Sequence, residues 1–194
     1  MDTPTTSSST KLFYGTFPQS RSLASWRVKG IAVVRILFGL VLGIDAWLKW
    51  QPTFQNYFTS YLTYAMNGQP HLVQSWIGFW LMIVKTNPGV FAHVVAFAES
   101  ALAIALCLGL FSNLAYIGGI VLTFLIWSTA EGFGSIYRPG ATDLGPAIIY
   151  TLVFAGLFLS SAGLCYGVDR LLTSRLGRLG FLACGRFTQG KEQE

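Results

Sequence analysis

A single glutamate, Glu99, lies near the middle of an apolar run that extends from Val90 to Phe111. A carboxylate at the centre of a bilayer costs about 2.5–3.5 kcal/mol even on lenient insertion scales, so such a residue usually faces the interior of a helix bundle. Alanines at helical spacing from Glu99 form a stripe of small residues, along which a second helix could approach closely: Ala92, Ala96 and Ala103. We therefore expect Glu99 to point inward.

The same run has no basic residue one helical turn from Glu99. Its partner must therefore come from another helix, or the carboxyl must bind a proton. A carboxyl that gains and loses a proton inside a membrane is a candidate catalytic proton relay. The alternative is a hydrogen bond between helices.

Asp45 and Lys49 stand four positions apart in another apolar run, with the acid before the base. This is the favourable order for an ion pair on a helix. Such a pair can simply neutralise charge near a helix end, and we favour that structural interpretation over a chemical one.

A polar segment, EGFGSIYRPGATDLG, runs from Glu131 to Gly145. It brings Glu131, Arg138 and Asp143 together in a turn rich in Gly and Pro. Exposed backbone amides and a guanidinium can hold an oxyanion there, although a plain salt-bridged turn is an equal alternative. Asp143 can also cap the helix that follows.

Aromatic residues gather where we expect the outer ends of the apolar helices. An aromatic belt at the membrane interface is one interpretation. The other is a vestibule for a planar lipid-soluble molecule such as a quinone, because flat aromatic walls would hold its ring. The residues concerned are Trp47, Trp50, Tyr57, Tyr61, Tyr64, Trp76, Trp80 and Trp127.

The elements that must position these residues are transmembrane helices. Hydrophobic residues make up 53% of the 194-residue chain and charged residues only 11%, which excludes an ordinary soluble domain. Four runs approach the roughly 20 apolar residues that a span requires. They are Gly30–Trp50, Val90–Phe111, Leu114–Gly134 and Leu144–Gly163. The run His71–Lys85 would reach only ~22 Å of a ~30 Å hydrocarbon core, so we expect an interfacial helix.

Charge predicts the topology. Basic residues concentrate before the first run and after the last, so both ends should lie in the cytoplasm. The predicted fold is an all-α integral membrane protein, a four-transmembrane-helix bundle with an interfacial helix between spans 1 and 2. Residues 29–163 form this domain, 1–28 a disordered or basic cytoplasmic tail, and 164–194 a second basic cytoplasmic tail.

Several kinds of site are not expected. The net charge of +5 comes from the flanks, which could touch anionic membrane lipid, and no nucleic-acid-binding module is visible. The three cysteines form no CxxC motif, and the two histidines, His71 and His93, are poorly placed for a haem. We find no metal or flavin motif.

Four segments in this order resemble the DoxX/DoxD membrane proteins: RILFGLVLGIDAWLKW, FAESALAIALCLGLFSN, EGFG with TDLGPAIIYTLVFAGLFLSSAG, and the closing CYGVDR. The resemblance covers Ile31 to Arg170, and EGFG and TDLGPAIIYTLVFAGL look closer to the DoxD branch. It implies a multi-pass protein of a prokaryotic plasma membrane. It also implies the membrane subunit of a thiosulfate:quinone oxidoreductase, which converts thiosulfate to tetrathionate and reduces a membrane quinone.

On that basis the candidate catalytic residues are Glu99, Glu131 and Arg138, and the candidate quinone-binding residues are Trp47, Trp127 and Lys49. Quinone is the expected electron acceptor and a sulfur oxyanion the expected substrate. Basic residues near the outer face are few, so a second protein subunit should supply others. The competing hypothesis is a non-catalytic membrane anchor or scaffold of a redox complex.

Overall fold

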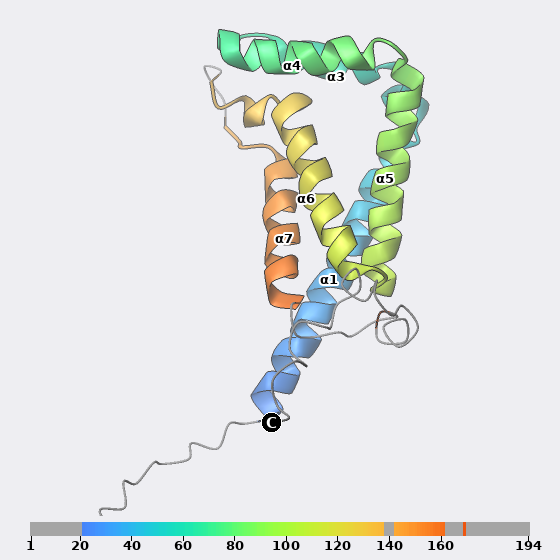
Figure 1. The fold of residues 1–194 in the computed structure, drawn as a ribbon, viewed down its shortest axis with the longest axis vertical. Coiled ribbons are helices and arrows are strands. Elements are labelled where there is room, and N and C mark those ends of the chain that lie inside the picture. The colour runs from blue at the N-terminus through green and yellow to red at the C-terminus, as the bar shows by residue number, and fades with distance from the viewer. Residues whose placement is uncertain (1–20, 138–141, 162–168, 170–194) are drawn as a thin grey trace, which may run out of the picture.

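The structure, a computed structural model, describes residues 21–137, 142–161 and 169. Within these residues all regular structure is helical (Figure 1), which confirms the all-α part of the prediction. The helices are α1 (Arg21–Lys49), α2 (Pro52–Asn56), α3 (Phe58–Met66), α4 (His71–Val84), α5 (Pro88–Leu108), α6 (Ser112–Thr129), the 3₁₀ helix η1 (Phe133–Ser135) and α7 (Pro146–Ser161).

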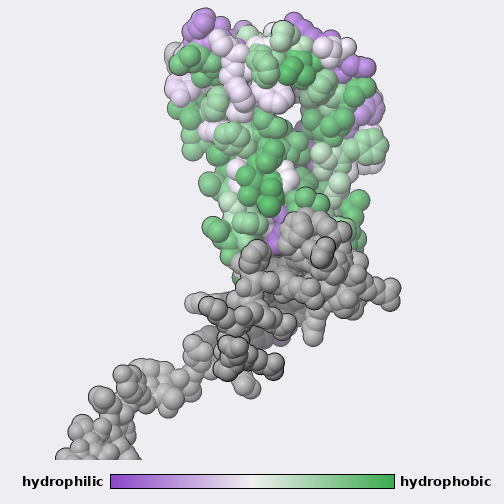
Figure 2. All heavy atoms as spheres, viewed as in Figure 1, coloured by the Kyte–Doolittle hydropathy of each residue, from purple (hydrophilic) through white to green (hydrophobic). Residues whose placement is uncertain are grey.

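Among the described residues, three helical segments are long and apolar enough to cross a membrane: Lys29–Lys49 within α1, all of α5 and all of α6. Their length and composition suggest a membrane protein. Figure 2 shows apolar side chains over most of the flank in view, while many hydrophilic ones gather at the end where α3 and α4 lie. The predicted fourth span corresponds to α7, of which 16 residues are described, and the predicted interfacial segment to the 14-residue α4.

The long helices run up and down, and α3 and α4 lie across one end of them (Figure 1). α5 descends from that end, α6 returns to it, and α7 descends again beside α6. The closest pairings are α1 with α5 and α6 with α7. We call α2, α3 and α4 together the end layer. The expected tails fall mostly outside the described residues, and α1 begins at Arg21.

Small residues let α1 and α5 approach closely, as predicted for a second helix from the alanine stripe beside Glu99. A Cβ placed on Gly39 would lie 2.8 Å from the Cys107 Sγ atom, and one on Gly43 would lie 3.9 Å from the Ala103 Cβ atom. The two backbones therefore meet with no room for a larger side chain at Gly39.

The turn between α5 and α6 is fixed from two directions. α5 ends at Gly109, whose φ of 64° favours glycine. The backbone N–H groups of Phe111 and Ser112 donate to the Asp169 carboxylate at 2.7 and 2.9 Å, and Asp169 is only 1% exposed. Arg35 is buried against Gly109 from the α1 side. This turn is thus capped by a residue far along the chain.

The end layer has its own apolar core, which includes Phe58, Leu62, Ile77 and Leu81. A buried side chain attaches this layer to the end of α6, because Gln69 Nε2 donates to the Gly132 carbonyl at 2.9 Å. The sequence had not indicated α2, α3 or η1. These elements nevertheless determine the shape of the candidate site.

Candidate functional site

An ion cluster joins α1 to α5. The Lys49 Nζ atom lies 3.2 Å from each carboxylate oxygen of Glu99 and 3.6 Å from Asp45 Oδ1. The Glu99 side chain is 4% exposed, that of Lys49 18% and that of Asp45 32%. Both the inward direction of Glu99 and the Asp45–Lys49 pair are confirmed. The basic partner of Glu99 does come from another helix.

The register of the two helices explains this meeting. α1 and α5 run antiparallel, and Gly43 lies against Ala103. Lys49 is six residues further along α1 and Glu99 four residues back along α5, so both lie toward the end layer. At the adjacent positions, the Trp50 indole N–H donates to Ser100 Oγ at 3.1 Å.

A cavity of about 650 Å³, which we call the end cavity, lies beside Lys49. The end of α1, the end layer, α5 and α6 all contribute to its walls, which are mainly apolar and aromatic. Lys49 and Glu131 are its charged lining residues, and Tyr61 and Val94, which also line it, are exposed, so the cavity reaches the molecular surface. The remaining lining residues are Leu48, Gln51, Thr53, Phe54, Phe58, Leu62, Trp80, Val84, Phe91, Val95, Leu122, Leu125, Ile126, Thr129 and Ala130.

Glu131 follows the end of α6 and caps α7. Its two oxygens accept the Ala147 N–H at 3.3 and 3.2 Å. The carboxylate lies so close to Gly145 that a Cβ there would collide with it. Asp143, the cap suggested by the sequence, instead accepts the Gly145 N–H at 3.1 Å. Burial raises the pKa of the Glu131 carboxyl, and the Ala147 N–H partly offsets this effect.

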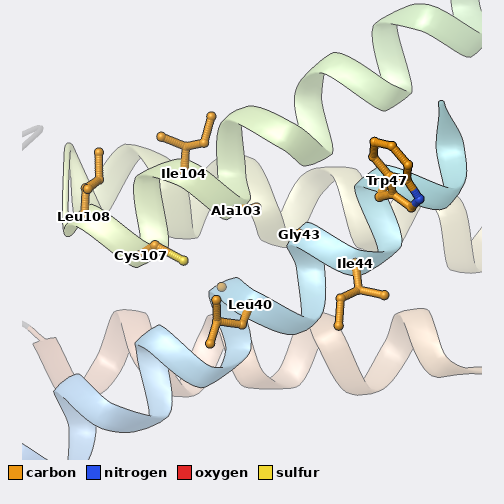
Figure 3. Close-up of a pocket in the computed structure, with 9 residues that line it drawn as sticks. Leu40, Gly43, Ile44, Trp47, Ala103, Ile104, Cys107 and Leu108 are labelled. Atoms are coloured by element: carbon orange, nitrogen blue, oxygen red, sulfur yellow. The ribbon is translucent and has the colours of Figure 1, made fainter.

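The two candidate tryptophans lie elsewhere. Trp47 is 66% exposed and lines a second, apolar hollow of about 610 Å³ between α1 and α5 (Figure 3). Trp127 donates its indole N–H to the Leu144 carbonyl at 2.8 Å, and its ring lies 5.0 Å from that of Phe133. Of the predicted quinone-binding residues, Lys49 alone lines the end cavity. Arg138 lies outside the described residues.

Sequence reasoning missed two features of this site. Lys49 and Glu99 were treated separately, although Gly39 and Gly43 in the run of Lys49 and the alanines in the run of Glu99 are small residues that let two helices meet. The cavity residues Tyr61 and Trp80 were named only within a broad set of interfacial aromatics, and Phe54 was not named. The helices α2 and α3, which complete the cavity, are too short to show a clear helical period in the sequence. In the described part of the chain, no His, Cys, Asp and Glu side chains gather in a group of three or more that could hold a metal.

Comparison of the chain with protein-family models, with curated proteins and with solved structures finds no match. The resemblance to the DoxX/DoxD proteins therefore rests on the quoted segments. The geometry of the end cavity provides an independent basis for a proposal.

Proposed function

We propose that this protein binds a membrane quinone in the end cavity and is the membrane subunit of a quinone-linked sulfur oxidoreductase. The observation that carries the quinone half is the end cavity itself, a mainly apolar hollow to which α1 contributes Lys49 and the segment after α6 contributes Glu131. Its volume of about 650 Å³ falls in the range of small-molecule sites. The aromatic rings of Phe54, Tyr61 and Trp80 suit a flat ring.

The sulfur half of the proposal is supported by the resemblance to the DoxD proteins. Two thiosulfate dianions lose two electrons and form tetrathionate, while the quinone takes up these electrons and two protons to become a hydroquinone. The segment that contains Arg138 would hold the sulfur oxyanion at the outer surface. Because basic residues near that surface are few, a second subunit would complete the anion site.

The same proposal places the bundle in a prokaryotic plasma membrane with four spans, both ends in the cytoplasm and α4 at the outer interface. Two observations support it: the basic flanks of the sequence and the position of α4 across the helix ends. Single cysteines replacing Ser75 on α4 and Lys29 on α1, in a cysteine-free background, test this topology. An impermeant thiol reagent added to intact cells should label Ser75→Cys alone, and labelling of Lys29→Cys would contradict the proposal.

Thiosulfate-dependent reduction of a short-chain quinone by the purified protein, alone and with co-purifying subunits, tests the activity. In an active preparation, Arg138→Gln should raise the KM for thiosulfate more than it lowers kcat, because the guanidinium contributes to substrate binding. Asp143→Asn provides a control in the same segment. Absence of activity from both preparations would favour the non-catalytic anchor or scaffold.

A further inference from the structure

The two charged side chains that line the end cavity interact with different groups of the protein. Lys49, on α1, forms its ion pairs with Asp45 and Glu99. Glu131, beyond α6, is hydrogen-bonded to the Ala147 N–H. They line one cavity without forming an ion pair with each other. Both side chains are therefore available to a ligand in the cavity.

The Lys49 side chain is held in place by its neighbours. Two carboxylates face its ammonium group, and the Phe54 ring centroid lies 5.4 Å from Nζ. An ammonium carries three N–H donors. Because both short contacts of Nζ go to the single carboxylate of Glu99, a donor remains for a ligand in the cavity.

Glu131 is suited to carry a proton. Its two oxygens share one backbone N–H, which leaves an oxygen able to hold a proton. The charged groups that act on it are Lys49, which favours the ionised form, and Asp143 and Asp45, which oppose it. Burial is the largest effect and raises its pKa.

We propose that Lys49 and Glu131 bind the two ring oxygens of the quinone, with Lys49 as a permanent hydrogen-bond donor and Glu131 as the acid that delivers a proton. This inference rests on the proposed function and assigns the proton transfer to Glu131 rather than Glu99. Glu99 and Asp45 are positioning residues, which hold the Lys49 ammonium at the cavity wall.

As the ring receives two electrons from the sulfur oxyanion, the O–H bond of Glu131 breaks and an O–H bond forms at the nearer ring oxygen. Water at the open side of the cavity supplies the second proton and then reprotonates Glu131. Lys49 keeps its protons throughout.

Quinone binding, measured without any sulfur compound, tests this assignment. The probe is a short-chain benzoquinone added to the full-length protein in nanodiscs, followed by quenching of tryptophan fluorescence from pH 5 to 9. Because only the protonated carboxyl can donate, wild-type affinity should fall as pH rises through the Glu131 pKa. We expect a loss of about tenfold or more, the worth of one hydrogen bond.

Glu131→Gln is the decisive variant. Its amide still donates to a ring oxygen and still accepts the Ala147 N–H, but it cannot lose a proton. Its affinity should therefore stay near the wild-type acid value at every pH. The Lys85→Met variant removes an exposed charge that is not among those acting on Glu131, so it should keep the wild-type profile.

The outcomes separate the two proposals. If the wild type binds no quinone at any pH, the proposed function is wrong. If the wild type binds and Glu131→Gln keeps the wild-type pH profile, the proton assignment is wrong and the quinone site stands. The double variant Lys49→Met/Glu99→Gln, which leaves no buried charge at position 99, should bind more weakly by a similar factor at all pH values. Unchanged binding by that variant would exclude Lys49 as a ligand contact.

Discussion

Replacement of Lys49 by Met should strongly destabilise the protein, since it removes the counter-ion of a buried carboxylate. Glu99 is 4% exposed, and Lys49 is the donor to both of its oxygens. Removal of one partner from a buried ion pair typically costs about 3–5 kcal/mol. The unfolding equilibrium constant should therefore rise by more than about 100-fold.

Replacement of the other partner, Glu99, should lower the free energy of unfolding by less. In Glu99→Gln, Lys49 retains Asp45 at 3.6 Å and its side chain is 18% exposed, so we expect a loss of about 1–2 kcal/mol. In Lys49→Met/Glu99→Gln no charge is left buried at position 99. The double variant should thus be more stable than Lys49→Met alone by about 1–3 kcal/mol.

Unfolding in bicelles by titration with sodium dodecyl sulfate, followed by tryptophan fluorescence, measures these differences. Lys85→Met, at the exposed end of α4, is the matched control and should stay within about 0.5 kcal/mol of the wild type. Equal stability of the Lys49→Met and Lys85→Met variants would refute the reasoning. So would strictly additive effects in the double variant, because they would mean that Lys49 and Glu99 do not interact.

Three further predictions concern other parts of the fold. Gly39→Ala should lower the free energy of unfolding by about 1–3 kcal/mol, because the added methyl group forces α1 away from α5. Gly30→Ala is the control, because a Cβ at this position has nothing within 4 Å, and it should not destabilise the protein. Equal melting temperatures of the two variants would contradict this prediction. Asp169→Ala should cost about 1–2 kcal/mol and speed amide exchange at Phe111 and Ser112, and unchanged exchange would show that the cap is unimportant. The pKa of Glu131 is raised from 4.5 in the folded protein. Its contribution to the free energy of unfolding is therefore complete below pH 4.5 and is lost as pH rises through the higher folded-state pKa. Glu131→Gln should flatten this part of the stability–pH curve, and an unaltered curve would argue against the raised pKa.

The long helices could be predicted from the sequence because their signals are local. The apolar run Val90–Phe111 and the helix α5 (Pro88–Leu108) differ by only a few residues at each end. The Asn87 side chain accepts the Val90 N–H, and Gly109 takes the left-handed conformation that ends the helix. The two ends of α5 are therefore determined by residues that are adjacent to them in the sequence.

The site could be predicted only in part, because its contacts depend on register and on the backbone path. Glu99 was expected to pair with a residue of another helix. The register of α1 against α5 determines that this residue is Lys49. Likewise, Asp143 is nearer in sequence to α7, yet the chain reverses so that Glu131 reaches the Ala147 N–H. The end cavity needs α2 and α3, helices of 5 and 9 residues, whose short length gives little periodicity to detect.

The cap supplied by Asp169 also determines when the turn between α5 and α6 can gain its last hydrogen bonds during synthesis. The N–H groups of Phe111 and Ser112 donate to the Asp169 carboxylate, which lies 58 and 57 positions later in the chain. A nascent chain in which α5 and α6 have already formed a hairpin therefore lacks this pair of hydrogen bonds until residue 169 has been added. The turn between these helices should consequently reach its final stability last, and chains truncated before Asp169 should be the preferred targets of membrane quality-control proteases.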